Sequence, residues 1–315
     1  MNKLVKHILK KIKEYNTIVI VRHKNSDMDA LGAQFAFKEW INLNFKDKQV
    51  YCIGENHQKY TKGFIPLSDS FESNEPFLGI CLDVNTIDRI AQDEMYKKAN
   101  YKICIDHHLY NENNEFDYVY VDNKASACCE ILAEMFLKSK KKMNTLVCKY
   151  LYAGISFDSG NFYYPSVTPK TLNLGAKLIE IGNFNPYNDI HMVVGMKSLR
   201  DLEIANFLFN KIVVDEDGFA YYENSLKDLE TLNVTASGAN EKISEFNKIE
   251  EIKIFLAASE CENHTYRCSL RSKEISVVEV AQKYGGGGHK LACGIKEITK
   301  EELEKLKEDL LNLTK

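Results

Sequence analysis

Asp106, His107 and His108 follow one another without a spacer, directly after residues 101–105, an apolar run typical of a β-strand. One carboxylate and two imidazoles in succession can bind a metal ion or contact a phosphate. In an open α/β sheet, ligands bind outside the carboxyl ends of the strands. A lone histidine there would indicate only a polar turn after a core strand, but three ligand-type residues in a row favour a functional site.

Other residues with metal-binding side chains follow expected strands and helices in the first half of the chain: His23, Asp27, Asp29, Asp83 and Asp158. Each of them alone would be explained as a helix cap or a loop acid. In the whole set oxygen ligands dominate and thiolates are absent, which suits Mn²⁺ or Mg²⁺ better than Zn²⁺. The aspartates outside the triplet carry enough charge to balance about two divalent ions, and such a pair can activate a shared water for displacement at phosphorus.

The elements that must position these residues alternate between strand and helix up to about residue 185. The patterns predict strands at residues 17–22, 49–53, 77–82, 101–105 and 116–121. They predict helices at residues 4–12, 29–41, 87–98, 126–138 and 146–157, and another that starts at 168. Such alternation is typical of an α/β domain with a doubly wound, mainly parallel sheet. The candidate ligands would then lie at the carboxyl ends of the first, third and fourth strands, with Asp158 at a helix end.

The pattern changes after residues 185–188, and a helical stretch through Leu199 and Ile204 is expected to act as a linker. Beyond it we expect a hairpin at residues 212–222, strands at 252–257, 266–271 and 291–295, and helices at 277–284 and from 299 onward. These segments form a smaller α/β domain. The predicted organisation is therefore a first domain over residues 1–186, a linker over 187–208 and a second domain over 209–315.

The composition limits the classes of function. A length of 315 residues favours two domains, and the net charge of −4 argues against a stable complex with long nucleic acid. The nine cysteines form no CxxC pair, which favours reduced thiols and a cytoplasmic protein. No apolar run is long enough to cross a membrane, so we expect no membrane association.

A second group of candidate residues lies near the end of the chain, where Ser269-Leu270-Arg271-Ser272 precedes the run Gly285-Gly286-Gly287-Gly288-His289-Lys290. Glycines allow backbone amides to approach an anion closely. Arg271 can bind a phosphate through two parallel hydrogen bonds. We expect a cradle for a phosphate or a base, although a glycine tract can also be only a flexible loop.

These motifs resemble those of a known family. His23-x-x-x-Asp27-x-Asp29, Asp83, Asp106-His107-His108 and Asp158 resemble the four motifs of the DHH phosphoesterases, in the same order. The Ser269–Ser272 and glycine-run motifs resemble those of the DHH-associated C-terminal domain. In length and layout the chain is most similar to the bacterial nano-RNase (oligoribonuclease) and pAp-phosphatase group. Ser26, Met28 and Cys293 depart from the usual pattern without removing a ligand.

The resemblance implies roles for the candidate residues in a cleft between the two domains. One Mn²⁺ would be held by His23, Asp27 and Asp83, and a second by Asp29, Asp83, His107 and Asp158. Among the catalytic residues Asp83 would bridge the ions, His108 would lie beside the scissile phosphate, and Asp106 would orient the histidines. Substrate would be bound by Ser269, Arg271, Gly287, Gly288 and His289. Arg89 is a further candidate for phosphate contact, or else an ordinary surface cation.

The activity implied is Mn²⁺-dependent hydrolysis, by attack of a hydroxide shared by two metals, of short RNA oligonucleotides and of 3′-phosphoadenosine 5′-phosphate (pAp). Mg²⁺ or Co²⁺ could substitute for Mn²⁺. The alternatives are hydrolysis of linear dinucleotides such as pGpG or pApA, a RecJ-like single-strand exonuclease, and a non-catalytic nucleotide-binding regulator. A regulator is expected to have lost ligands, and a family II pyrophosphatase would carry a Ser-Arg-Lys motif that this chain lacks. Substrate ranking, direction of degradation and formation of a homodimer stay open.

Overall fold

The chain forms two compact units in a computed structural model, Met1–Met196 and Lys197–Lys315. The structure describes residues 1–56, 63–72, 75–109, 115–246 and 249–315. The division between the units falls within residues 187–208, which we expect to link two domains; the domain boundaries themselves stay a prediction.

A five-stranded sheet forms the centre of the N-terminal unit, and all of its strands are parallel. The strands are β1 (Thr17–Val21), β2 (Gln49–Cys52), β3 (Phe77–Leu82), β4 (Tyr101–Asp106) and β5 (Tyr118–Val121). Their spatial order is β2-β1-β3-β4-β5. From β1 the chain first adds β2 on one side and then adds β3, β4 and β5 in succession on the other side. The doubly wound sheet expected from the sequence is therefore confirmed, and its switch point, where ligands bind in such folds, lies between β1 and β3.

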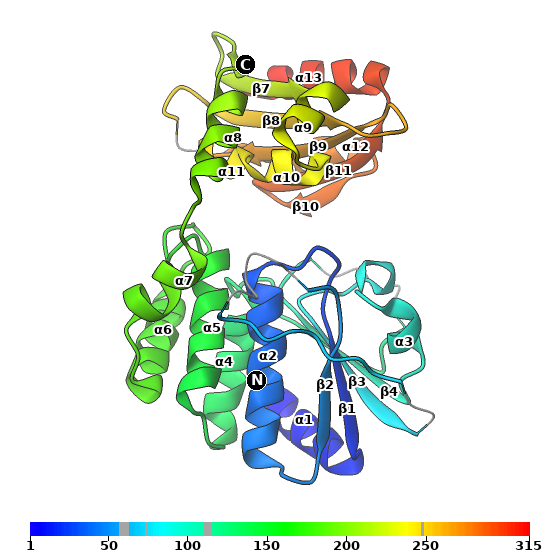
Figure 1. The fold of residues 1–315 in the computed structure, drawn as a ribbon, viewed down its shortest axis with the longest axis vertical. Coiled ribbons are helices and arrows are strands. Elements are labelled where there is room, and N and C mark those ends of the chain that lie inside the picture. The colour runs from blue at the N-terminus through cyan, green and yellow to red at the C-terminus, as the bar shows by residue number, and fades with distance from the viewer. Residues whose placement is uncertain (57–62, 73–74, 110–114, 247–248) are drawn as a thin grey trace. The chain divides into compact units, whose positions relative to one another are not determined.

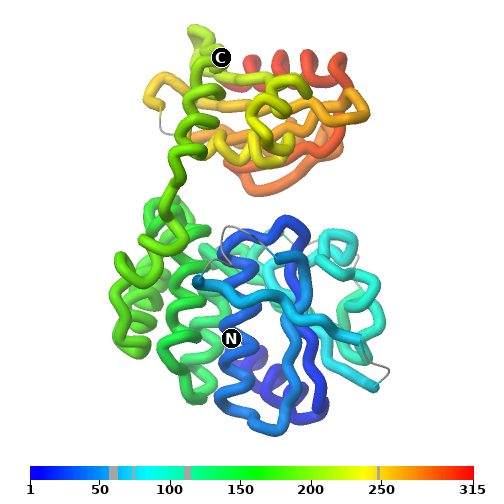
Figure 2. Tube along the Cα trace, viewed as in Figure 1, coloured from blue at the N-terminus to red at the C-terminus, as the bar shows by residue number. Residues whose placement is uncertain are grey.

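Helices cover both faces of this sheet (Figure 1). They are α1 (Asn2–Glu14), α2 (Met28–Asn44), η1 (Ile87–Arg89), α3 (Asp93–Lys97), α4 (Cys128–Ser139), α5 (Thr145–Asp158), α6 (Pro169–Gly182), η2 (Tyr187–His191) and α7 (Met192–Val194). The main core packs α1, α2, α4 and α5 against one face, where Ile20 and Ile80 are fully buried. On the other face Ile90 and Tyr96, from the η1–α3 segment, pack against Val19. Figure 2 follows the chain through α5 and back along α6.

The helix expected at residues 87–98 is the main local difference from the sequence prediction. The structure has a single 3₁₀ turn, η1, followed by the short helix α3. Gln92 lies between them in the left-handed conformation, with φ 62° and ψ 41°, which interrupts any continuous α-helix. The other elements of this unit agree with their predicted positions to within a few residues.

Two glycines allow α2, α4 and α5 to pack in unusually close contact. A Cβ added to Gly32 would lie 2.6 Å from the carbonyl oxygen of Tyr150. One added to Gly154 would collide with Sγ of Cys129 and lie 2.8 Å from Oδ1 of Asp29. Because interiors are close-packed, neither position can accept a larger residue without displacing a neighbour. This close approach brings the end of α5 beside the start of α2.

A six-stranded mixed sheet forms the C-terminal unit, in the order β10-β11-β9-β8-β7-β6. Its strands are β6 (Val213–Val214), β7 (Phe219–Asn224), β8 (Ile254–Glu260), β9 (Tyr266–Ser272), β10 (Gly287–His289) and β11 (Ala292–Ile298). Its helices are α8 (Leu199–Phe209), α9 (Leu226–Leu232), α10 (Ala236–Glu241), α11 (Ile243–Phe246), α12 (Val278–Lys283) and α13 (Lys300–Thr314). The predicted hairpin is confirmed as the antiparallel β6–β7 pair. No prediction covered the stretch that helices α9 to α11 occupy.

The glycine run forms a turn and an edge strand, and the cradle for a phosphate or a base that we expect there stays a prediction. Gly285 turns the chain with φ 71°, and Gly287 to His289 then pair with β11 in antiparallel register. Gly288 has φ 147°, and a Cβ there would collide with the carbonyl oxygen of Ala292. Only glycine can adopt this conformation so close to the next strand.

Among the helices that the structure describes, none has the length and apolar character that a membrane span needs.

Replacing Gly154 with alanine tests the close packing of α2, α4 and α5. We expect Gly154→Ala to lower the free energy of unfolding by about 1–3 kcal/mol, because overpacking forces neighbouring groups apart. Gly238→Ala is the control, since a Cβ there comes no closer than 3.4 Å to any atom and alanine suits a helix better than glycine. Denaturant unfolding of both variants measures the difference. Equal stability of Gly154→Ala and the wild type would contradict this account of the packing.

Candidate metal centre

All of the metal ligands predicted in the first half of the chain lie together at the carboxyl edge of the parallel sheet. Their ligand atoms form three overlapping groups, and within each group the atoms lie no more than 4.8 Å apart. The groups are His23 with Asp27 and Asp83, Asp29 with His107 and Asp158, and Asp83 with Asp106, His107 and His108. Sequence positions more than 130 residues apart thus contribute to one site.

The first group lies at the ends of β1 and β3. His23 follows β1 by two residues, and its Nε2 lies 3.5 Å from Oδ2 of Asp83 and 3.9 Å from Oδ2 of Asp27. Asp27 is the N-cap of α2, where its Oδ1 accepts a hydrogen bond from the amide of Ala30 at 3.0 Å. The cap fixes the side chain, so that Oδ2 is the oxygen directed toward His23.

Asp83 is shared between the groups and is held in an unusual conformation. It follows β3 directly, its φ is 60°, and its amide donates to the carbonyl oxygen of Ile105 on β4. Its Oδ1 is buried and accepts no hydrogen bond in the described part of the chain, although imidazole nitrogens of His107 and His108 lie at 3.4 and 3.6 Å. Strained residues of this kind persist where the surroundings determine them, often at functional sites.

Asp29 is fixed by the amino-terminal end of another helix. Its Oδ2 accepts a hydrogen bond from the amide of Cys128 at 2.6 Å, and its Oδ1 accepts one from that of Cys129 at 2.9 Å. Both amides belong to the first turn of α4, so the side chain of Asp29 caps a helix 99 residues further along the sequence. The positive end of the helix dipole partly offsets the cost of burying this carboxylate.

The charges in the site shift the pKa values of its members in opposite directions. Burial opposes ionisation of Asp83, but the imidazoles of His107 and His23 outweigh it and hold the pKa of Asp83 well below its usual range. Burial raises the pKa of Asp158 to about 6, although His107 lies 3.2 Å away and acts against the shift. Burial, together with the charges of Asp83 and Asp158, raises the pKa of Asp29 well above its usual value. The carboxylates therefore repel one another, and a nearby cation would relieve the repulsion.

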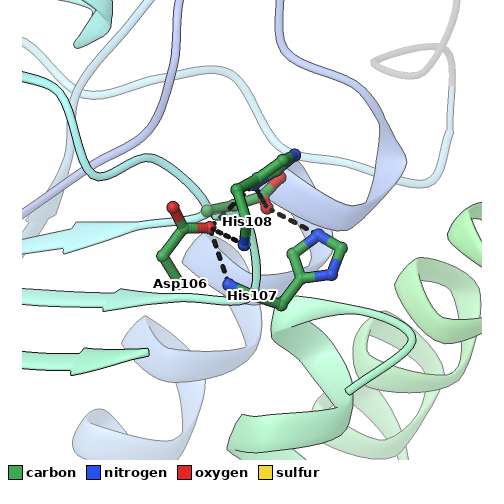
Figure 3. A group of neighbouring side chains, drawn as sticks. Asp106, His107 and His108 are labelled. Carbon is green, nitrogen blue, oxygen red and sulfur yellow. Dashed lines mark hydrogen bonds and ion pairs between the residues drawn. The ribbon is translucent and has the colours of Figure 1, made fainter. Parts of the chain in front are cut away.

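Asp106 has a different place from the other aspartates, because its oxygens are occupied by hydrogen bonds within the protein (Figure 3). Its Oδ1 accepts from the amide of His107 at 2.7 Å and from Nδ1 of His108 at 2.8 Å. Its Oδ2 accepts from the side-chain amide of Asn85 at 2.6 Å. These contacts fix the orientation of His108, whose pKa is raised because Asp106 and Asp83 outweigh the opposing effect of burial.

The donor set fits divalent metal ions with a preference for oxygen ligands. Carboxylate oxygens dominate, and the buried Oδ1 of Asp83 is directed into the cluster. The nearest thiols do not change this picture, since Cys128 and Cys129 donate to backbone carbonyl oxygens and burial raises their pKa values well above the usual range. Such thiols do not become the thiolates that favour Zn²⁺.

Arg22, which is not among the predicted site residues, supports the loop that carries His23 and Asp27. Its guanidinium is fully buried, and burial lowers its pKa to about 10. It donates to four neutral acceptors: Oγ of Ser26 at 3.0 Å, Oε1 of Gln34, the carbonyl oxygen of Glu55, and Oγ of Ser68 at 3.2 Å. One side chain therefore connects the loop after β1 with α2 and with the segments after β2.

The partners of Arg22 are themselves held in place. The side-chain amide of Gln34 donates to the carbonyl oxygens of Ile20 and Ile53, which leaves its Oε1 directed at Arg22. Gly54, with φ 145°, lies against the guanidinium, and a Cβ there would lie 3.0 Å from its carbon. The side chains of Arg22, Gln34 and Asn85 do not usually bind metal ions. The only sequence signal that could have identified them as supporting residues is a charged or polar residue beside a buried strand.

The predicted substrate-binding residues lie in both units. Arg89 ends η1 and is exposed; the adjacent Ile90 forms a β-bridge with His23, and the carbonyl oxygen of Arg89 accepts from Lys24 at 2.8 Å. In the C-terminal unit Arg271 on β9 pairs with Ala292 on β11, which pairs with His289 on β10. Residues in one such row share a face of the sheet.

Ser269 and Gly287 lie in the neighbouring row on that same face, because both pair with Gly294. Gly288 lies in the intervening row, with the buried residues Leu270 and Cys293. Side chains of Ser269, Arg271 and His289 thus belong to one face, whereas Gly288 contributes backbone only.

The sequence of this chain is similar to known protein families in both of its units. The profile of the DHH family, N-terminal domain, matches residues 17–155, and that of the DHHA1 domain matches residues 227–315. The chain is 34% identical over 313 residues to the probable bifunctional oligoribonuclease and PAP phosphatase NrnA of Streptococcus mutans serotype c, covering 98% of this chain and 99% of that protein. It is 29% identical over 313 residues to the bifunctional oligoribonuclease and PAP phosphatase NrnA of Bacillus subtilis, with 98% of each chain covered.

A solved structure shares the fold. The crystal structure of an exopolyphosphatase-related protein from Bacteroides fragilis has a TM-score of 0.84 at 20% sequence identity, and the match covers 100% of this chain and 98% of that chain. At this level of identity the likeness concerns the fold alone.

Substitution of Arg22 tests its role in supporting the site. We expect Arg22→Met to lower the free energy of unfolding by about 2–4 kcal/mol, because it leaves several buried acceptors without a donor. Lys97→Met is the control, since Lys97 forms only exposed ion pairs and its loss should have no measurable effect. Chemical denaturation measures both. A stability of Arg22→Met equal to that of the control would show that the buried contacts of Arg22 do not hold the loop.

Proposed function

The chain belongs to the DHH family, and we propose that it is a Mn²⁺-dependent phosphoesterase that hydrolyses short RNA oligonucleotides and pAp. The main support is that every side chain expected of a two-metal site is present at one sheet edge. The relatives named oligoribonuclease and PAP phosphatase, which match this chain along nearly its whole length, support the choice of substrates.

The metal-binding assignment follows the groups of ligand atoms. We propose that His23, Asp27 and Asp83 hold one ion, and that Asp29, Asp83, His107 and Asp158 hold the other. When bound, two such ions supply positive charge that lowers the pKa of water and offsets charge developing on the phosphate. Mn²⁺ is favoured because oxygen donors dominate the set, and Mg²⁺ or Co²⁺ can take its place.

His108 is the proposed acid and electrostatic partner at the scissile phosphate. Its Nδ1 donates to Asp106, which fixes the ring and stabilises its protonated form. A protonated imidazole can donate a hydrogen bond to a phosphate oxygen and can pass a proton to the leaving oxygen. Asp106 acts through His107 and His108, and is thus a positioning residue.

Arg271 and His289 are proposed to bind the part of the nucleotide away from the scissile bond, with Ser269, Gly287 and Gly288 beside them. A guanidinium binds a terminal phosphate well, since charge-assisted hydrogen bonds are the strongest in proteins. Arg89 is proposed as a further phosphate contact near His23.

Incubation with a panel of substrates tests the proposed activity. With Mn²⁺ we expect hydrolysis of pAp and of oligoribonucleotides a few residues long, and slow turnover of long RNA and of pyrophosphate. Linear dinucleotides belong in the panel, because their preferential hydrolysis would move the function to cyclic-dinucleotide turnover. Binding without hydrolysis of any member would indicate a regulator.

Asp83→Asn tests the proposed two-metal site. Loss of residues that only orient ligands typically costs about 10- to 100-fold, so loss of a shared ligand should lower the Mn²⁺-dependent rate by more than about a hundredfold. Asp88→Asn is a matched control, since Asp88 is exposed and lies five residues further along the same segment. Steady-state rates with pAp compare the two variants. Full activity of Asp83→Asn would refute the assignment.

Arg271→Ala tests the proposed phosphate anchor. We expect KM for pAp to rise about tenfold or more, because a hydrogen bond to a charged group is lost. Arg267 is four residues earlier on β9 and on the same face, where it donates to Ser237, so Arg267→Ala controls for loss of charge from the strand. An unchanged KM in Arg271→Ala would place the anchor elsewhere.

A further inference from the structure

The turn that follows Asp158 has a strained backbone. Gly160, Asn161 and Phe162 have φ angles of 59°, 60° and 61°, which places three consecutive residues in the left-handed region. Residues with a side chain adopt this region singly and seldom, and a bulky residue such as phenylalanine is an outlier there. A turn of this kind persists only when its surroundings determine it.

Several contacts hold the turn in this conformation. The amide of Asn161 donates to the carbonyl oxygen of Ser156 at 2.6 Å, and its side chain is hydrogen-bonded to Oγ of Ser156 at 2.7 Å. The amide of Phe162 donates at 3.0 Å to Oγ of Ser159, which is itself fully buried. The ring of Phe162 packs on Gly175 of α6, where a Cβ would lie 3.1 Å from it. These contacts tie the turn to the end of α5 and to α6.

This turn carries two exposed tyrosines a few residues after Asp158 of the metal centre. The amides of Tyr163 and Tyr164 both donate to the carbonyl oxygen of Ser159 at 2.9 Å, which places their backbones against the residue that follows Asp158. Tyr163 is 69% exposed and Tyr164 is 40% exposed. Their rings meet edge to face at 6.4 Å, and the ring of Tyr164 lies over Gly160, where a Cβ would approach it to 2.6 Å.

Reversal of the chain between α5 and α6 does not by itself require this arrangement. The same unit ends α6 with one left-handed residue, Asn183, whose short polar side chain tolerates the conformation. A strained backbone that exposes two large aromatic side chains is better explained by a ligand that contacts the rings. Tyrosine gives a large contact area at a low cost in conformational entropy, as in other binding surfaces.

We propose that Tyr163 and Tyr164 form a stacking surface for the nucleobase of the nucleotide whose phosphate lies at the Asp158 end of the metal centre. This inference rests on the proposed function, since it assumes a nucleotide substrate. Stacking on an aromatic ring tolerates any base, because every base has a π face. The surface would therefore favour nucleotides over other phosphoesters without selecting a sequence.

The experiment compares a dinucleotide with its abasic counterpart, which keeps both riboses and all phosphates. In the full-length wild type we expect a lower KM for the base-bearing substrate. In the double variant Tyr163→Ala/Tyr164→Ala this preference should fall by about tenfold to a hundredfold, the range for loss of aromatic stacking on a base. The corresponding double phenylalanine variant should retain the preference, because it keeps the rings and removes only the hydroxyls.

Tyr187→Ala is the matched control, since Tyr187 is also exposed but belongs to η2, whose Asp189 pairs with Lys149 far from the Asp158 end of α5. A dinucleotide that carries 2-aminopurine gives a second readout, because its fluorescence is quenched by stacking whether or not hydrolysis occurs. Quenching by wild type that is lost in the alanine variant supports the proposal. A preference or quenching unchanged in the alanine variant overturns it, and so does an equal loss in the phenylalanine variant. Quenching in a protein that hydrolyses no member of the panel would reject the proposed function and leave the stacking surface in place.

Discussion

Mutual repulsion among carboxylates at one sheet edge is the constraint on which the N-terminal unit depends. The fold brings Asp27, Asp29, Asp83, Asp106 and Asp158 together with three histidines. Each acid has a distinct source of stabilisation: helix caps for Asp27 and Asp29, and hydrogen bonds from Asn85 and the histidines for Asp106. Asp83 and Asp158 depend chiefly on imidazoles, and they are the positions at which added positive charge would stabilise the site most.

The ligand-type residues could be predicted from the sequence because of a simple property of parallel sheets. Strands that run in one direction end at one edge, so acids and histidines after β1, β3 and β4 had to meet. The residues that support them carry no comparable signal. Arg22 acts through neutral acceptors, and the amides of Cys128 and Cys129 act through the backbone, across sequence separations that only the folded chain defines.

The fold was predictable where local pattern and tertiary packing agree. The strand predicted at residues 17–22 and the helix predicted to start at 168 are present as β1 and α6. Prediction of secondary structure failed where single residues take left-handed conformations. Gln92 breaks the helix expected at residues 87–98, and the edge strand formed by Gly287 to His289 was not predicted. The conformation of Gly288 depends on the pairing of its strand with β11, where Ala292 leaves no room for a Cβ, and hydrophobic periodicity does not report such a pairing.

The central claim is that one shared carboxylate, Asp83, joins two divalent ions in a single site. Electron paramagnetic resonance of Mn²⁺ titrated into the full chain tests it most directly, because ions that share a ligand are magnetically coupled. The account predicts two bound Mn²⁺ per chain with a coupled spectrum, and loss of that coupling in Asp83→Asn. A single bound ion, or two ions with uncoupled spectra in the wild type, would contradict it.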